Sequence, residues 1–192
     1  MRIITISREF GSGGRELGKC LAEIMHFDYY DQEIITSIAQ NKGLDANYVE
    51  TQLENHNWHS KTSHNSVSLL VEQKKVLENI AALGKDCIIV GRNADVILKA
   101  YQPLNLFVCA DMETKLRRCM ERSPEGEHLT EKELLRKIKQ IDKIRSQTRE
   151  ILTNSPWGQR EFYHLTINTN GWNMDELANA VSDFANRWFR RK

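Results

Sequence analysis

The sequence predicts an α/β fold with three layers, a parallel sheet that carries helices on both faces. Short apolar runs of strand length recur at residues 2–7, 87–90 and 104–109, and a segment with helical spacing follows each of them. Strands that alternate with helices imply right-handed crossovers, with ligands bound beyond the carboxyl ends of the strands. The length of 192 residues fits a single domain.

Composition narrows the class of protein further. With 40% hydrophobic residues, 28% charged residues and a net charge of +1, the chain reads as an ordinary globular protein without a global charge for nucleic acid or membrane. The apolar stretch at residues 3–6 is shorter than the core of about 7–15 residues in a secretory signal, and no run approaches the roughly 20 of a membrane span. These features predict a cytoplasmic protein. The four cysteines form no C-x-x-C pair and read as buried hydrophobic residues, which is favoured over a zinc site of Cys119 with histidines.

The first elements follow from local patterns. The β-branched run 2–7 ends at a glycine cluster, which indicates a buried strand that leads into a turn. A helix is expected from Gly14 to His26, with an apolar face of Leu17, Leu21 and Ile24. The aromatic segment 27–31 predicts a short strand, and residues 32–42 predict a helix that Gly43 closes.

The middle of the chain contains a polar insert. Residues 45–66 have little apolar periodicity after Leu53, which is typical of a surface insert. Ser66 or Ser68 is expected to cap a helix that runs through Leu83. Residues 93–101 fit a short helix between two strands.

The last third predicts three helices and a strand. Residues 112–121 continue as a helix, and Thr130 with Glu133 forms a capping box that opens a long amphipathic helix. Residues 163–168 read as the last strand, and Asn173 or Asp175 begins a closing helix. The apolar stripe of the long helix consists of Leu134, Ile138, Ile141, Ile144, Ile151 and Leu152.

The strongest functional signal is the glycine-rich segment 7–16 between a predicted strand and a predicted helix. Glycines let the backbone approach a phosphate, and the N–H groups at a helix start point at an anion. The candidate phosphate-binding residues are Arg8, Gly11, Ser12, Gly13, Gly14, Arg15 and Glu16. The alternative is a glycine turn that only joins a strand to a helix. The phosphate interpretation is favoured because several arginines are expected at the same strand ends, namely Arg8, Arg15, Arg92 and Arg145.

The match to the P-loop pattern G-x-x-x-x-G-K-[ST] is imperfect. With Gly14 as the last glycine, Arg15 replaces the lysine and Glu16 replaces the hydroxyl that binds magnesium, while Glu9 stands at the first glycine. Arginine keeps the positive charge and can bind phosphate oxygens with two hydrogen bonds. Ser7 or Ser12 could supply the missing hydroxyl.

Several segments together resemble the cytidylate kinase-like family. They are, in the order of that family, residues 7–16, 27–35 and 89–98, the helix segment 141–145, the Trp157–Gly158 pair and the strand 163–169. The resemblance implies a nucleoside monophosphate kinase fold with a core of residues 1–30, 84–121 and 161–192. It implies an acceptor-binding insert at 31–83, a helical lid at 122–160, and ATP with Mg²⁺ as cofactors.

The resemblance also implies roles for single residues. It places Asp31, Arg92, Asn93 and Asp142 on the acceptor side, and it gives catalytic roles in charge neutralisation to Arg15, Arg145 and Arg149. A salt-bridging arginine after a strand is the alternative for Arg92. A solvated basic helix face is the alternative for Arg149 and, with less weight, for Arg145.

The sequence departs from the family pattern at positions that bind the metal and at positions that bind the acceptor. Val90 and Cys109 occupy places where relatives can carry an acid, so the metal ligands are unknown, with Glu9, Glu16 and Asp31 as candidates. The Asp-x-Gly-x-x-Tyr-Arg acceptor pattern is absent after Tyr30, which argues against a specificity for cytidine.

Two hypotheses follow. The first is a kinase for a small acceptor, and the second is a nucleotide- or phosphate-binding regulatory protein with weakened catalysis. Nucleic-acid binding through the basic-aromatic segment 187–192 and Trp58 is disfavoured, because such an end is more typical of a final helix turn. The expected partners are a nucleotide and a small-molecule acceptor, and the sequence leaves open a homo-oligomer.

Overall fold

A computed structural model describes residues 1–31, 64–122 and 129–191 of the chain. Its sheet has five parallel strands in the order β2-β3-β1-β4-β5. The strands are β1 (Ile3–Arg8), β2 (Asp28–Asp31), β3 (Cys87–Val90), β4 (Leu104–Cys109) and β5 (Leu165–Asn168). Each strand overlaps a segment predicted as a strand, and the predicted α/β class is confirmed.

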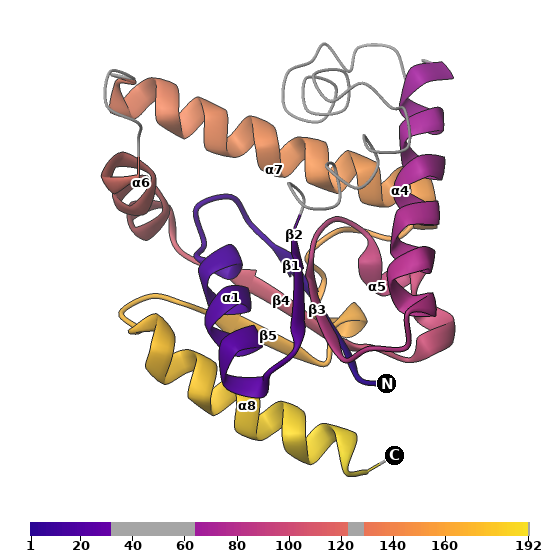
Figure 1. Ribbon diagram of the computed structural model, residues 1–192. Helices are drawn as coiled ribbons and strands as arrows, with labels where there is room; N and C mark the ends of the chain where they lie inside the picture. Colours follow the sequence, from indigo (N-terminus) through magenta and orange to yellow (C-terminus); the bar gives the residue numbers. More distant parts are fainter. Residues whose placement is uncertain (32–63, 123–128, 192) are drawn as a thin grey trace.

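Helices cover both faces of the sheet (Figure 1). They are α1 (Gly14–Met25), α4 (His64–Ala82), α5 (Ala94–Ile97), α6 (Met112–Glu121), α7 (Glu131–Thr153) and α8 (Met174–Phe189), with short 3₁₀ turns η1 (Lys99–Tyr101) and η2 (Arg160–Phe162). Within the described residues, no helix is both long enough and apolar enough to span a bilayer.

The strand periodicity divides the core into two clusters. On one face Ile4 and Ile6 of β1 pack with residues of α1 and α8, such as Leu17 and Val181. On the other face Ile3 packs with residues of α4 and α5. Since successive side chains of a strand point to opposite faces, alternate residues of one strand contribute to both clusters.

Several helix ends confirm the predicted caps. Thr130 and Glu133 form the capping box of α7, and the side chain of Asn173 accepts hydrogen bonds from two backbone N–H groups at the start of α8. The choice left open between Asn173 and Asp175 therefore falls on Asn173. Gly84 adopts a positive φ of 71° directly after α4 and its last turn.

Two predictions about helices are wrong. Helix α4 begins at His64, before the serines at 66 and 68 that were expected to cap it, because nothing between these residues breaks a helix. Ile151 and Leu152 were expected in the buried stripe of α7, yet they are 47% and 37% exposed. The buried positions of these last turns belong instead to Thr148 and Arg149. The helix predicted at 32–42 and most of the insert at 45–66 lie outside the described residues.

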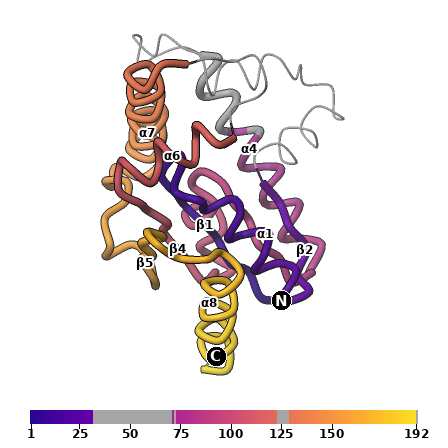
Figure 2. Tube along the Cα trace, turned by 90° about the vertical axis from the view of Figure 1, so that its left-hand side faces the viewer, coloured from indigo at the N-terminus to yellow at the C-terminus, as the bar shows by residue number. Residues whose placement is uncertain are grey.

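Helix α7 runs across the carboxyl ends of the strands, at the end of the molecule opposite α8 (Figures 1 and 2). The predicted division into core, insert and lid stays a prediction. Helix α4 contributes Val76, Leu77, Ile80 and Ala81 to the core cluster around Ile3. At the carboxyl end of the central strand β1, α7 covers the sheet and α6 lies nearby.

Candidate phosphate-binding site

The glycine-rich loop between β1 and α1 leads directly into the start of a helix. Gly11 and Gly13 adopt φ values of 76° and 80°, and Gly13 is the N-cap of α1 without a side-chain cap. Other residues rarely adopt this conformation, so the loop requires glycine at both positions. Within the part of the chain that the structure describes, the N–H groups of Gly11, Gly13 and Gly14 have no acceptor. An anion could therefore bind to this half of the loop.

The other half of the loop is already held by protein groups. The backbone N–H of Phe10 donates to Asp142 Oδ1 at 2.7 Å, and the hydroxyl of Ser12 donates to the carbonyl of Glu9 at 2.8 Å. Asp142 belongs to α7, so its carboxylate occupies a position that a phosphate oxygen could take. The backbone N–H groups of Phe10 and Ser12 are thus engaged by Asp142 and by the Glu9 carbonyl, unlike those of the three glycines.

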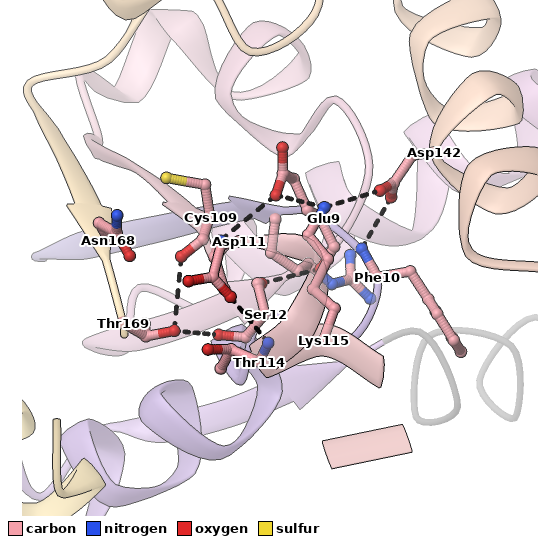
Figure 3. A network of polar contacts seen from close by, with 12 residues as sticks. Glu9, Phe10, Ser12, Cys109, Asp111, Thr114, Lys115, Asp142, Asn168 and Thr169 are labelled. Atoms are coloured by element: carbon pink, nitrogen blue, oxygen red, sulfur yellow. Dashed lines mark hydrogen bonds and ion pairs between the residues drawn. The ribbon is translucent and has the colours of Figure 1, made fainter. Parts of the chain in front are cut away.

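An ion-pair network joins the loop to two helices (Figure 3). Lys115 Nζ of α6 lies 2.6 Å from Glu9 Oε2 and 3.5 Å from Asp142 Oδ2. Glu9 also accepts the backbone N–H of Ala110 at 3.3 Å. Burial raises the pKa of the Asp142 carboxyl, and the Phe10 N–H with the nearby Arg145 and Lys115 cations opposes this rise. The network positions the first residues of the loop against α6 and α7.

A second set of buried hydrogen bonds fixes the loop at the Ser12 carbonyl. Arg118 Nη1 donates to the carbonyl of Ser12 at 3.0 Å and to Thr169 Oγ1 at 2.7 Å, and the Thr169 hydroxyl donates to the same Ser12 carbonyl at 2.7 Å. Arg118 is 8% exposed and Thr169 is fully buried. Burial lowers the pKa of the Arg118 guanidinium. These two groups fix the position of the Ser12 carbonyl.

Three arginines gather beside the loop. Arg145 Nη1 donates to the carbonyl of Arg8 at 2.8 Å and lies 3.5 Å from Asp142 Oδ1. Arg15 Nε donates to Asp31 Oδ2 at 2.8 Å, with its own side chain 46% exposed. Burial, followed by the positive charge of Arg145, lowers the pKa of the Arg8 guanidinium to about 9. Arg8 therefore still carries a positive charge at neutral pH, in a setting that favours a bound anion.

Two of the four predicted acceptor residues, Arg92 and Asn93, follow β3. Arg92 and Asn93 are 8% and 3% exposed, and Asn93 has a φ of 59°. The side chain of Gln73 in α4 donates to the Arg92 carbonyl at 3.4 Å. Asp31, the third residue assigned to this side, pairs with Arg15. Asp142, the fourth, belongs to α7 and accepts the backbone N–H of Phe10 in the loop.

The two arginines of α7 occupy different environments. Arg145 reaches the loop, whereas Arg149 Nη1 lies 2.5 Å from Asp95 Oδ2, in an ion pair whose side chains are both 2% exposed. A buried pair of this kind joins α7 to α5. The geometry favours a structural contribution of Arg149. The alternative, a solvated basic helix face, is wrong for this residue because its side chain is buried.

The acids near the loop do not form a metal site. Glu9 and Asp142 pair with Lys115, and Glu16 pairs with Arg122 of α6. Among the described residues, no group of three or more histidines, cysteines or acids could hold a metal ion. These three acids are therefore engaged by the protein's own cations.

Sequence reasoning missed three residues of this site, namely Lys115, Arg118 and Thr169. Lys115 and Arg118 lie one helical turn apart on α6, which a helical projection could have placed on one face. Nothing in the local pattern indicates that this face contacts the loop, because Arg118 and Ser12 are 106 residues apart in the chain.

Comparisons with known proteins agree with this fold. A solved structure of an uncharacterized protein from Eubacterium ventriosum is 26% identical with a TM-score of 0.74, and the match covers 97% of this chain and 99% of that chain. Shikimate kinase from Acinetobacter baumannii, solved in complex with shikimate, is 17% identical with a TM-score of 0.57 over 96% and 92%. Shikimate kinase from Bacteroides thetaiotaomicron is 12% identical with a TM-score of 0.60 over 95% and 97%.

The two shikimate kinases show the fold alone at these identities. None of the curated proteins matches the sequence. The cytidylate kinase-like family matches residues 3–171, which is most of the chain and includes every element of the loop site described above. By this match, the chain belongs to the cytidylate kinase-like family.

Proposed function

We propose that the protein is a cytoplasmic phosphotransferase that moves the γ-phosphoryl group of ATP to a nucleoside monophosphate or a similar small acceptor. Family membership and fold support a phosphotransferase in general. The observation that carries the proposal is the open half of the loop, where the N–H groups of Gly11, Gly13 and Gly14 have no acceptor in the described part of the chain. These groups would bind the phosphates of the nucleotide.

The remaining roles follow from the arginines. Arg145 lies at the loop and is 8% exposed, so its charge acts in a poorly solvated setting where it would stabilise a transferring phosphoryl group strongly. Arg92, directly after β3, is the candidate for the acceptor phosphate. Phosphoryl transfer requires positioning and charge neutralisation, so no covalent nucleophile from the protein is needed.

A second candidate function rests on the paired acids. Since Glu9, Asp142 and Glu16 all contact cations of the protein, the described residues offer no evident carboxylate for the metal of a Mg·ATP complex. A regulatory protein that binds a nucleotide without turnover would have this arrangement. Mg²⁺ could still arrive with the nucleotide, bound through phosphate oxygens and water.

Turnover measured by phosphorus NMR, with ATP, Mg²⁺ and a panel of monophosphates and small alcohols, separates the two candidates. Transfer to one acceptor supports the enzyme, and ATP binding without transfer to any acceptor supports the regulatory protein. The absence of any nucleotide or phosphate binding overturns both.

A pair of glycine variants tests the loop itself. A Cβ at Gly13 would lie 2.8 Å from Met174 Cε and 3.1 Å from Arg118 Nη1, whereas a Cβ at Gly84 would contact nothing within 4 Å. Their φ values are 80° and 71°, so an alanine strains both backbones similarly. Gly13→Ala is expected to weaken nucleotide binding, and Gly84→Ala is expected to leave it unchanged. Equal affinities for the two variants would contradict the loop assignment.

A further inference from the structure

Arg8 and Gly14 compete for one space beside the loop. A Cβ added to Gly14 would lie 2.7 Å from Arg8 Cβ and 3.1 Å from Arg8 Cγ, and 3.3 Å from Val108 Cβ. Distances this short are below those that packed side chains adopt. The stem of Arg8 therefore lies where a side chain at position 14 would begin, and the backbone accommodates a long side chain at position 8 or at position 14, not at both.

The start of α1 sets the register in which the loop is compared with the P-loop pattern. Gly13 is the N-cap and Gly14 is the first helical residue. If Gly13 serves as the last glycine of G-x-x-x-x-G-K-[ST], the first glycine of the pattern falls on Arg8 and the lysine falls on Gly14. This register differs by one residue from the one that the sequence suggested, in which Arg15 replaced the lysine. In the new register, the cation and the glycine have exchanged places.

We propose that Arg8 supplies the phosphate-binding cation of this loop, with its side chain passing over Gly14 in place of a lysine at that position. This inference rests on the proposed function and assigns a further residue to the same site. The ligand is the polyphosphate chain of a nucleotide, held by the guanidinium of Arg8 and by the N–H groups of the glycines.

The charges around Arg8 support this assignment. Within the described residues, the guanidinium of Arg8 makes no hydrogen bond or ion pair. Asp31 and Tyr29 only raise its pKa through longer-range electrostatic interaction. The carboxylate of Asp31 is engaged by Arg15 at 2.8 Å. Arg145, which binds the Arg8 carbonyl, adds a second positive charge beside it. A half-buried cation next to another cation is costly unless an anion binds between them.

Arg15 fits the same task less well. Its side chain is 46% exposed and its Nε donates to Asp31, so part of its charge is neutralised on the side of β2. A guanidinium engaged by a carboxylate must give up this partner before it can bind a phosphate with full strength. The two arginines therefore make different predictions for the same measurement.

Titration calorimetry with inorganic tripolyphosphate and with ATP tests the inference on binding alone, without turnover. Arg8→Gln is expected to weaken both affinities by about 10- to 150-fold, the scale of a lost charged hydrogen bond. Arg117→Ala, which removes an exposed cation of α6, is the control and is expected to change them less than twofold. An affinity of Arg8→Gln within threefold of the wild type overturns the inference, as does a larger loss for Arg15→Ala than for Arg8→Gln.

The exchange itself is tested by a double variant, Arg8→Gly with Gly14→Lys, whose folding is checked by circular dichroism. Recovery of tripolyphosphate affinity to within threefold of the wild type supports the exchange, and a folded double variant as weak as Arg8→Gln overturns it. Since these outcomes concern binding, they stay separate from the proposed reaction. If tripolyphosphate binding depends on Arg8 but no phosphoryl group is transferred to any acceptor, the proposed reaction is refuted while the assignment of Arg8 stands.

Discussion

The substitution Lys115→Met removes the ammonium group that joins the loop to α7. This group lies 2.6 Å from Glu9 Oε2 and 3.5 Å from Asp142 Oδ2, and the Lys115 side chain is 6% exposed, so water cannot readily replace it. Removing one partner of a buried ion pair costs about 3–5 kcal/mol. Glu9 and Asp142 keep 26% and 17% exposure and one backbone N–H donor each. We therefore expect the free energy of unfolding to fall by about 2–3 kcal/mol.

Urea denaturation at pH 7 measures this loss. With an m-value of about 2 kcal/mol/M, the midpoint should decrease by about 1–1.5 M. The matched control is Arg117→Met on the same helix, since Arg117 pairs with Glu121 at 3.3 Å and both side chains are exposed, at 60% and 58%. An exposed pair of this kind contributes less than about 0.5 kcal/mol.

The pH dependence of the same variant adds an independent check. Burial already raises the pKa of Asp142, and the loss of the Lys115 charge should raise it further. Between the ordinary and the raised pKa, the folded state binds more protons than the unfolded state, so the free energy of unfolding falls as pH rises through this window. The difference between variant and wild type should thus be smaller at pH 5 than at pH 7. A loss below about 1 kcal/mol, or an equal loss at both pH values, would refute the reasoning.

Two further predictions concern close packing and a buried pair. A Cβ at Gly18 would lie 2.5 Å from Val90 Cγ2, so Gly18→Ala should destabilise the protein by about 1–3 kcal/mol despite its better helix propensity. A double-mutant cycle with Val90→Ala, measured by urea denaturation, should show coupling of at least about 0.5 kcal/mol, and strict additivity would contradict the contact. Arg149→Leu should lower the free energy of unfolding by about 3–5 kcal/mol because Asp95 loses its buried partner. The double variant Arg149→Leu with Asp95→Leu should unfold at a higher temperature than the single one, and the opposite order would show that the pair is not what holds α7 to α5.

The outcome for α7 shows how far helical periodicity reaches. Arg145 and Arg149 are one turn apart, and from that spacing the sequence predicts that they face the same way. In the structure, Arg145 contacts the Arg8 carbonyl, while Arg149 is buried against Asp95. The difference depends on which strand end lies below each turn of the helix, and this depends on the order of the strands in the sheet.

The loop shows the same limit. Its glycines and its place between a strand and a helix are local features, and the sequence was sufficient to find them. The partners of Glu9 and of the Ser12 carbonyl are not local, because Ser12 contacts Arg118 and Thr169 at separations of 106 and 157 residues. The register of the phosphate pattern also required the structure, since the close approach of the Arg8 side chain to Gly14 is a contact through space.

By itself, the sequence determined the alternating strands and helices, the capping box of α7 and the presence of a glycine loop at the first strand end. These features depend on dihedral preferences and on side-chain periodicity within about a dozen residues. The tertiary structure decided which N–H groups of the loop stay open, which acids are neutralised by cations, and that the side chain of Arg8 fills the space above Gly14. Such contacts exist only after distant segments have packed together, because charge pairing and steric exclusion act through space and leave no periodic signal along the chain.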